Sequence, residues 1–430
     1  MSDPLKIAIA GLGIVGADVA RLLLERADAY AARAGRRLEL VAVSARDQTK
    51  DRGVDLSSVR WFASAADMAV ETAADVVVEL IGGAEGVAKD TVAAALANGR
   101  HVVTANKALL ARHGVALARA AESAGVSLNF EAAVAGGIPI IKALREGLAA
   151  NEISRLYGIL NGTCNFILTT MRETGRDFAD VLAEAQALGY AEADPSFDVD
   201  GVDTAHKLAI LTSLAFGTEV NVDAVHIEGI RHISALDIAY AEELGYRIKL
   251  LGIARQTEHG IEQRVHPCMV PKANPLAAVD GVFNAVVAEG DAVGRSVYQG
   301  RGAGGGPTAS AVVADLLDIA AGRRVPTFGV PAEALAPLPP WSMARHRGAY
   351  YIRLMVRDVP GVFADIASAL RDAEVSMEAI LQRGRAPGEV VPVVMTLHDT
   401  EEARAQQALS RIGAMAAMVE PPRVIRIEDL

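Results

Sequence analysis

Aromatic residues, cysteines and long apolar runs are scarce in this sequence, and each shortage narrows the class of protein. Aromatic residues make up only 4% of the 430 residues while hydrophobic residues make up 51%, so Ala, Val, Leu and Ile must build most of the core. The two cysteines, Cys164 and Cys268, provide no disulfide framework and fit a reducing compartment. No apolar run reaches the roughly 18–20 residues of a membrane span, and the amino terminus lacks a signal-peptide pattern. We therefore expect a cytoplasmic protein that does not enter a membrane.

Positive charge is also in short supply. The chain carries 42 Lys and Arg against 53 Asp and Glu, a formal net charge of −11, and has no long basic run. That balance argues against a nucleic-acid partner or an anionic membrane surface. The 9 histidines show no HxxxH or HExxH spacing, so no zinc site is expected. At roughly 150 residues per domain, the length indicates about three domains.

The first expected domain, residues 1–150, alternates short apolar strands with helices. This alternation is typical of a parallel, doubly wound α/β sheet of the Rossmann type. Strands are expected at residues 5–10, 38–43, 75–80, 101–104 and 126–130. Helices are expected at residues 17–25, 89–98 and 109–124.

A glycine pattern, Gly11-x-Gly13-x-x-Gly16, follows the first expected strand and opens the first expected helix. In that context Gly11 permits a tight turn, Gly13 lets the backbone approach a pyrophosphate, and Gly16 lets helix and strand pack closely. Backbone N–H groups of the loop, including those of Ile14 and Val15, would bind the phosphates together with the helix dipole. We therefore expect an NAD(P)-binding domain; the alternative is a purely structural turn.

The residues after the second expected strand bear on the choice of coenzyme. NAD sites usually place a carboxylate at this strand end, to bind the ribose hydroxyls. Here the chain reads Ser44-Ala-Arg46-Asp, with Lys50 close by, so Arg46 could pair with a 2′-phosphate. We expect NADP, with NAD possible; the alternative is that Arg46 is a solvated loop residue.

Residues 151–320 follow a different pattern, which predicts an α+β substrate-binding and dimerisation domain. Strands are expected at residues 153–159, 247–254, 261–270 and 283–288, with helices at 177–188 and 204–216. A helix at 309–320 is expected to return to the nucleotide domain. Residues 321–348 contain five prolines and are expected to form a linker.

The most informative stretch runs from Glu192 to Lys207 and holds five carboxylates and one lysine. Asp203 and Lys207 are spaced i, i+4 and so share one face of the expected helix. Clustered carboxylates could bind a substrate ammonium, and a lysine beside them could move a proton at an oxygen next to a hydride-transfer carbon. The alternative is an acidic capped loop with a surface ion pair.

This run, G-Y-x-E-x-D-P-x-x-D-V-x-G-x-D-x-x-x-K, resembles the motif of the homoserine dehydrogenase family, as does the upstream run Asn161-Gly-Thr-Cys-Asn-Phe-Ile-Leu. The resemblance covers about residues 5–320. It implies reversible NAD(P)H-dependent reduction of L-aspartate 4-semialdehyde to L-homoserine, a step in threonine, methionine and isoleucine biosynthesis. It also implies site roles: Lys207 as acid/base, Gly189 at the coenzyme, and Glu192, Asp198 and Asp203 binding or orienting the amino acid.

Three further segments carry the same resemblance. Lys107 follows the fourth expected strand and resembles a family lysine between coenzyme and substrate, a second candidate for proton transfer; otherwise it is a loop charge. The Gly300–Thr308 run, with Gly304, would close over the coenzyme; otherwise it is a linker turn. The remaining segment resembles a site for a monovalent cation, Na⁺ or K⁺, held by one carboxylate and backbone carbonyls. Its residues are Glu131, Val134, Gly136 and Ile138, and the alternative is a structural Gly-Pro turn.

Residues 349–430 predict a ferredoxin-like βαββαβ unit. Strands are expected at 350–356, 375–382, 390–397 and 423–428, with helices at 362–371 and 403–412. The run Val356-Arg-Asp358-Val-Pro-Gly361 resembles the opening of an ACT domain, a regulatory module that pairs with a second copy and binds amino acids. The resemblance implies an L-threonine effector near Asp358 and Gly361, in a homodimer or homotetramer; the alternative is a dimerisation module without ligand. We also expect that this module can be removed without unfolding the rest.

Two other functions remain as alternatives at this point. Another Rossmann reductase of amino-acid metabolism, such as a diaminopimelate-pathway enzyme, would lack the Glu192–Lys207 cluster. A non-catalytic amino-acid sensor would have lost the glycines or lysines, which are all present.

Overall fold

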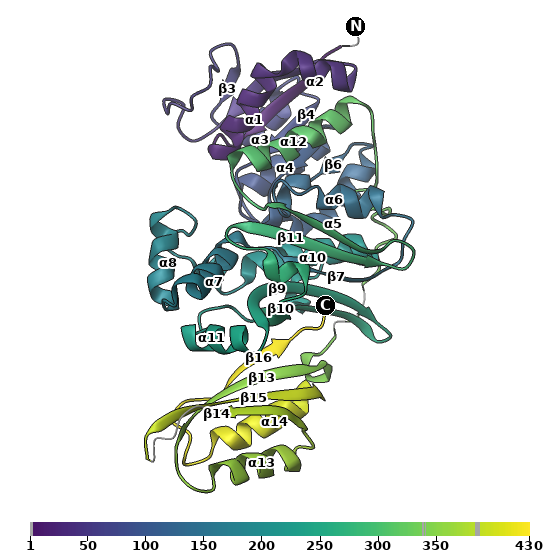
Figure 1. Ribbon diagram of the computed structural model, residues 1–430. Coiled ribbons are helices and arrows are strands. Elements are labelled where there is room, and N and C mark those ends of the chain that lie inside the picture. Colours follow the sequence, from purple (N-terminus) through teal and green to yellow (C-terminus); the bar gives the residue numbers. More distant parts are fainter. Residues whose placement is uncertain (1–2, 338, 340, 383–387) are drawn as a thin grey trace.

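The computed structural model describes residues 3–337, 339, 341–382 and 388–430. Three units follow one another along the molecule: an amino-terminal α/β unit, a central α+β unit and a carboxyl-terminal unit, and the chain ends between the last two (Figure 1). Within the described ranges, no helix has both the length and the hydropathy needed to span a bilayer.

The amino-terminal unit is built on a six-stranded parallel sheet with the strand order β3-β2-β1-β4-β5-β6. Its strands are β1 (Leu5–Ala10), β2 (Leu38–Ser44), β3 (Arg60–Phe62), β4 (Val76–Glu79), β5 (His101–Thr104) and β6 (Leu128–Asn129). Its helices are α1 (Ile14–Glu25), α2 (Ala27–Ala34), α3 (Ala65–Glu71), α4 (Val87–Ala97) and α5 (Lys107–Ser123). The expected Rossmann sheet is confirmed, while the short β3, α2 and α3 were not expected.

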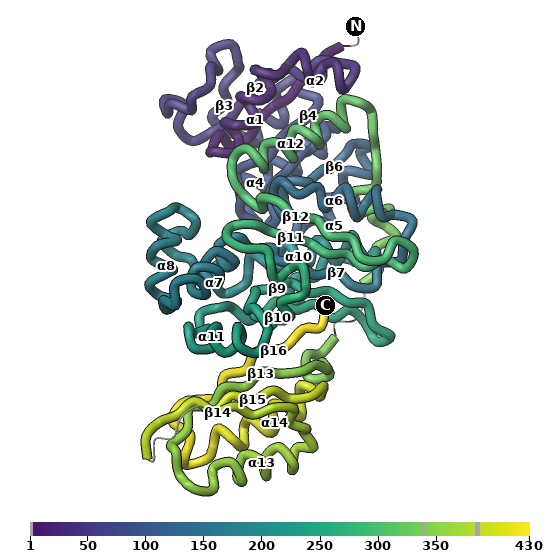
Figure 2. Tube along the Cα trace, in the orientation of Figure 1, coloured from purple at the N-terminus to yellow at the C-terminus, as the bar shows by residue number. Residues whose placement is uncertain are grey.

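Helix α12 (Gly305–Ala320) lies beside α1 although some 280 residues separate them in the sequence (Figure 2). Its buried Val312 and Leu316 belong to the same apolar cluster as Ile7 and Ile9 of β1. The predicted return of this helix to the nucleotide domain is therefore confirmed. The return brings the preceding glycine-rich turn back toward the dinucleotide loop.

The central unit has longer, mostly antiparallel strands covered by helices. Its strands are β7 (Ile153–Ile159), β8 (His226–Ile227), β9 (Tyr246–Thr257), β10 (Gly260–Pro271), β11 (Phe283–Gly290) and β12 (Gly294–Arg301). Its helices are α6 (Ile140–Lys142), α7 (Gly162–Thr174), α8 (Phe178–Ala187), α9 (Ser196–Val199), α10 (Val202–Phe216) and α11 (Ala235–Glu243). Sequence reasoning missed α7, α11 and β12, as well as the short α6, α9 and β8. Helix α10 is buried along nearly its whole length, which explains its continuous apolar sequence.

The carboxyl-terminal unit has the predicted βαββαβ order. Its elements are β13 (Arg347–Arg357), α13 (Val362–Asp372), β14 (Met377–Gln382), β15 (Val390–Glu401), α14 (Glu402–Gly413) and β16 (Arg423–Ile427). Strand β16 pairs in parallel with β10, and one ten-stranded sheet therefore runs through both units. The expectation of a separable module is not supported, because the central sheet continues into it.

Residues 321–348 are not a free linker, in contrast to the expectation from their prolines. Phe328, Ala332 and Leu335 are buried in the main apolar cluster, and the Phe328 ring lies 5.4 Å from that of Phe130. This proline-containing segment packs on the molecule. The free energy gained by burying its apolar side chains outweighs the conformational entropy that an exposed linker would keep. Pro340 of this segment lies outside the described residues.

Candidate active site

The dinucleotide loop has the close approaches that its glycines predict. Gly11 has a φ of +100°, and a Cβ there would lie 2.6 Å from the carbonyl oxygen of Leu80. A Cβ at Gly16 would lie 2.0 Å from the Gly11 carbonyl oxygen, whereas the space around Gly13 is open. Ile14 is 79% exposed at the start of α1, while Val15 packs partly against the core. The loop therefore presents an open helix amino terminus that fits a pyrophosphate.

The loop after β2 carries the residues expected to select the coenzyme. Arg46 and Lys50 are both exposed there. Arg52, which sequence reasoning did not single out, donates to the carbonyl oxygens of Leu12 at 3.0 Å and Lys50 at 2.7 Å. Its guanidinium thus ties the Arg46 loop to the glycine loop, a contact that only the tertiary structure reveals.

Buried Glu79 organises the strand ends beside this loop. Its carboxylate accepts hydrogen bonds from the backbone of Ile81 at 2.7 Å and Gly82 at 3.0 Å, and from the Thr104 hydroxyl at 2.6 Å. Two residues further on, the Asn106 side chain caps α5. These contacts place Lys107 at the first turn of α5, at the carboxyl edge of the parallel sheet. The sequence offered no signal for Glu79 beyond its place in an apolar strand.

A single carboxylate, that of Asp203, joins the two expected catalytic lysines. Its Oδ1 lies 2.7 Å from the Nζ of Lys107, and its Oδ2 accepts a hydrogen bond from the Nζ of Lys207 at 2.7 Å. Lys207 also donates to the Leu160 carbonyl oxygen at 2.7 Å. The structure thus brings together residues that are almost 100 positions apart in the sequence.

Asn161 holds two of the acidic side chains, Asp198 and Asp203, in place by hydrogen bonds. Its Nδ2 donates to Asp198 Oδ1 and to Asp203 Oδ2, both at 2.8 Å, while its Oδ1 caps α7 by accepting from Cys164 N. Asn161 was quoted only as part of a motif and was not predicted as a site residue. Glu192 is exposed at the rim of the same cavity.

Burial and charge shift the ionisation of these groups in different directions. Burial opposes ionisation of Asp203, yet the ammonium groups of Lys207 and Lys107 hold its pKa well below the ordinary value. Burial lowers the pKa of Lys207, whereas at Lys107 the attraction of Asp203 outweighs burial and raises the pKa. Burial and the Asp203 charge raise the pKa of Asp198. Of the two lysines, Lys207 is therefore the one that gives up its proton more easily.

These groups open into a cavity of about 700 Å³. Its lining includes Gly189 and Gly304 along with both lysines and four carboxylates of the motif, those of Glu192, Asp194, Asp198 and Asp203. A Cβ at Gly305 would lie 2.9 Å from the Ile14 side chain, so the glycine-rich turn before α12 lies directly beside the dinucleotide loop. The cavity thus extends from the acidic cluster to the glycine-rich turn that lies beside the coenzyme loop, an arrangement that suits hydride transfer between two bound molecules.

The segment expected to bind a cation forms a tight, buried turn. Glu131 is 2% exposed and accepts from the backbone N–H groups of Ile141 and Lys142, both at 2.9 Å. Burial and neighbouring Asp315 raise the pKa of Glu131 to about 7. Gly136, with a φ of +52°, packs against the Gly302 carbonyl. Val134 and Ile138 are both buried in the turn.

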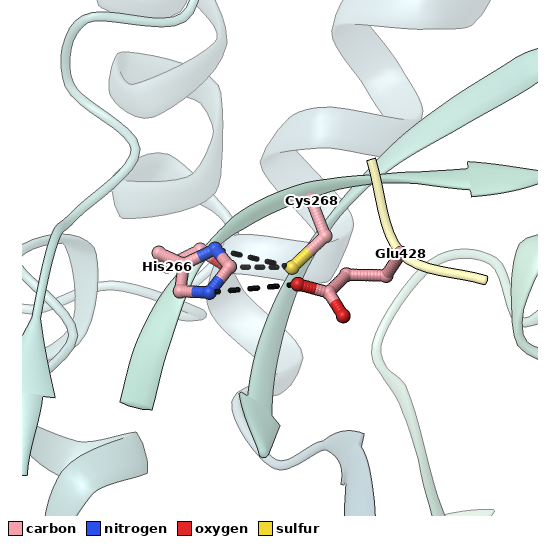
Figure 3. Close-up of side chains that lie close together, drawn as sticks. All are labelled: His266, Cys268 and Glu428. Carbon is pink, nitrogen blue, oxygen red and sulfur yellow. Dashed lines mark hydrogen bonds and ion pairs between the residues drawn. The ribbon is translucent and has the colours of Figure 1, made fainter. Parts of the chain in front are cut away.

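His266, Cys268 and Glu428 form a buried cluster where β10 meets the end of the chain (Figure 3). The Sγ of Cys268 lies 3.3 Å from His266 Nδ1 and donates to the His266 carbonyl oxygen. Arg264 donates to His266 Nε2 at 2.7 Å and forms a bidentate pair with Glu428. The guanidinium already supplies the positive charge that a metal ion would bring to these side chains, so we interpret the cluster as a structural junction.

The residues expected to bind an effector lie at the start of α13. Gly361 caps that helix with a φ of +98° and open space around its Cα. Asp358 precedes it, and its backbone bonds to Glu389 and Gly388. Both residues are in the carboxyl-terminal unit and neither lines the 700 Å³ cavity.

Comparisons with known proteins cover all three units. A family model described as homoserine dehydrogenase matches residues 139–317, and one described as the NAD binding domain of homoserine dehydrogenase matches residues 11–131. A model of the ACT domain matches residues 350–416. Together the matches span the coenzyme, substrate and carboxyl-terminal units described above.

Whole proteins of the same description align with the chain from end to end. The chain is 47% identical to homoserine dehydrogenase of Pseudomonas aeruginosa over 434 residues, covering 99% of each. A crystal structure of homoserine dehydrogenase from Thiobacillus denitrificans is 47% identical, with a TM-score of 0.93 and coverage of 99% of this chain and 98% of that one. A hyperthermophilic archaeal homoserine dehydrogenase in complex with NADPH is 29% identical, with a TM-score of 0.63 and coverage of 73% and 97%.

Proposed function

The chain belongs to the homoserine dehydrogenase family. We propose that it catalyses the reversible NAD(P)H-dependent reduction of L-aspartate 4-semialdehyde to L-homoserine in its cavity of about 700 Å³. The observation that carries this proposal is Asp203, which holds Lys107 and Lys207 within 2.7 Å of its two oxygens. The family match and the intact lysines and glycines set aside both alternatives, another pathway reductase and a non-catalytic sensor. The decisive test follows the absorbance of the reduced coenzyme with homoserine as substrate.

In the direction of reduction, the bound coenzyme supplies a hydride to the aldehyde carbon of the substrate. The carbonyl oxygen gains negative charge and takes a proton from the Nζ of Lys207, which yields the alcohol. Two of the donors of Lys207 are directed to Leu160 and Asp203, so one remains for this oxygen. In the reverse direction neutral Lys207 accepts the proton from the homoserine hydroxyl. Lys107, whose pKa is raised, serves better as a fixed positive charge.

The carboxylates of the cavity select an amino acid. Asp198 is held by Asn161 and Glu192 lies at the rim, so both can accept hydrogen bonds from the substrate ammonium. A substrate without the amino group should therefore bind weakly, since these carboxylates would lose their cationic partner.

We also propose NADP as the preferred coenzyme and the cytoplasm as the compartment. Arg46 and Lys50 are exposed just after β2, where the 2′-phosphate of a coenzyme on this loop would lie. The last residue of β2 is Ser44, which carries no carboxylate. The archaeal relative was crystallised with NADPH, which is consistent with this preference. Two free, buried cysteines, Cys164 and Cys268, fit a reducing compartment.

A monovalent cation is proposed at the Glu131 turn, with carbonyl oxygens of Val134, Gly136 and Ile138. A cation would offset the charge of a carboxylate whose pKa burial raises to about 7. The test compares activity in potassium, sodium and a bulky organic cation, for the parent and Glu131→Gln. The parent should lose activity in the bulky cation, and the variant should be indifferent to the choice.

Finally, we propose that the carboxyl-terminal unit binds L-threonine near Asp358 and Gly361 in a homodimer or homotetramer. The open helix amino terminus at Gly361 suits a carboxylate. Threonine should inhibit, and Gly361→Val should weaken that inhibition, while Gly322→Val, a glycine with a φ of +73° in open space, should leave it unchanged. Inhibition that is equal in all three proteins would mean that threonine acts at the homoserine cavity. Analytical sedimentation measures whether the protein is a homodimer or a homotetramer.

A further inference from the structure

Behind the wall of the substrate cavity lies a buried lysine that the mechanism above does not use. Lys249 on β9 is 1% exposed. Its Nζ donates to three oxygens: the Val279 carbonyl at 2.6 Å, and Asn165 Oδ1 and Asp280 Oδ1, each at 3.1 Å. All three donors of the ammonium are therefore used inside the protein.

These contacts tie together α7, β9 and the loop that precedes β11. Asn165 also binds the same loop, because its Nδ2 donates to the carbonyl oxygens of Val279 at 3.0 Å and Phe283 at 3.1 Å. Arg172 of α7 pairs with both oxygens of Asp280 at 2.8 and 3.0 Å. Residues 279–283 are thus held at both ends through the carbonyl oxygens of Val279 and Phe283, and between them through the side chain of Asp280.

The anchored loop reaches the active site at Val282, which lines the cavity. The Val282 carbonyl is so close to Gly162 that a Cβ there would lie 2.7 Å from its oxygen. The residue before Gly162 is Asn161, whose amide holds Asp198 and Asp203. A shift of the loop would therefore move the amino end of α7 and, with it, the carboxylates.

We propose that Lys249 is a positioning residue for the substrate cavity, where it clamps the 279–283 loop against α7 and so sets the placement of Asp198 and Asp203. This inference rests on the proposed function, and it deepens it by adding a group that never touches substrate. Lys249 acts through Asn165, Val282 and Gly162, and it affects substrate affinity and kcat together, because Asp203 also positions both lysines.

The ionisation of Lys249 provides a means of testing this clamp. Burial lowers the pKa of Lys249 to about 8, against the attraction of Asp280. The charged groups that face it are Asp280 from the loop, Arg172 from α7 and Arg247 from its own strand; Glu242 of α11 contacts Arg247 at 3.4 Å. Above about pH 8 the amine loses a proton and its charge, so one anchor weakens.

The experiment measures kcat, the KM for homoserine and the KM for coenzyme between mildly acid and alkaline pH. In the parent, the homoserine KM should rise above about pH 8. Lys249→Arg, which keeps its charge, should move this rise to higher pH. Asp280→Asn, which removes the group that raises the pKa of Lys249, should move it to lower pH. Lys249→Met should raise the homoserine KM about 10-fold or more at neutral pH and should also lower kcat, since Asp203 positions both lysines, with the coenzyme KM within about 3-fold.

Lys272→Met is the matched control, because Lys272 is exposed and its Nζ donates to the Glu242 carbonyl, away from the cavity. If Lys249→Met does not fold, the opposite shifts of the arginine and Asp280→Asn variants still decide the matter. A homoserine KM whose pH profile is the same in parent, Lys249→Arg and Asp280→Asn would overturn the proposal, as would a loss confined to thermal stability. A parent that does not oxidise homoserine at all would instead overturn the proposed function.

Discussion

The coenzyme half and the substrate half of this active site are built by different means. The coenzyme half consists largely of backbone: a glycine loop, a helix amino terminus and exposed side chains on one strand tip. The substrate half consists of buried charges, in which Asp203, Lys207 and Asn161 each depend on the others. The first half therefore tolerates independent changes in its side chains, whereas the second should respond as a unit.

The two halves also differ in how they join the rest of the chain. The coenzyme sheet is a separate six-stranded sheet, but the substrate sheet continues through β10 and β16 into the carboxyl-terminal unit. Buried ion pairs cross this second junction between Arg353 and Asp237 and between Arg264 and Glu428, and buried Arg426 also pairs with Glu228. The regulatory unit is thus a structural part of the substrate half.

The largest expected effect comes from removing residues 349–430. Truncation would leave Cys268 and Met269 of β10 without their β16 partners and Asp237 and Arg264 without their carboxyl-terminal partners; each broken buried pair costs about 3–5 kcal/mol. The substrate half should lose its cooperative unfolding transition and its activity, while the coenzyme half keeps a transition that NADP raises. Calorimetry with and without coenzyme checks this. A truncated chain with parental kcat and parental transitions would show that the junction is dispensable.

Lys207→Ala should lower kcat by about 10²- to 10⁴-fold, because the proton donor is lost. The dissociation constant for coenzyme, from fluorescence titration, should stay within about 2-fold, since the glycine loop does not contact Lys207. Exposed Lys272→Ala is the control. If Lys207→Ala turns over within a few-fold of the parent, Lys107 is the proton donor instead.

Asp203→Asn should raise the homoserine KM and lower kcat, together by about 10- to 150-fold in kcat/KM, the value of a charged hydrogen bond of roughly 1.5–3 kcal/mol. The reason is that one carboxylate positions both lysines. Coenzyme affinity should again be unaffected. A variant that changes only the melting temperature would make Asp203 a structural residue.

Arg46→Ala tests the coenzyme half and should have the smallest effect. The KM for NADP should rise about 2- to 5-fold, as expected for one exposed ion pair of up to about 1 kcal/mol, and the KM for NAD should hardly change. Arg33→Ala, an exposed arginine on α2, serves as the control. Equal changes for both coenzymes would contradict the assignment of Arg46 to the 2′-phosphate.

Local patterns were enough to predict much of the chain. The Rossmann sheet, the glycine loop and the βαββαβ order were correct because strand period, glycine geometry and helix signals are properties of neighbouring residues. Asp203 and Lys207 could be paired in advance because they are one helical turn apart. Helix α7 was missed although Cys164, Ile167, Leu168 and Met171 recur at helical spacing and Asn161 provides a typical cap.

The sequence by itself determined the class of fold, the coenzyme loop and the motif that carries the acid and base groups, because each lies within a short stretch of chain. Only the tertiary structure decided which distant groups meet. It brought Lys107 to Asp203, placed Lys249 behind the cavity wall and tied Arg52 to the glycine loop. It also paired β16 with β10. Backbone groups at a strand edge and buried charges need partners, and these can come from any part of the chain that the fold brings close.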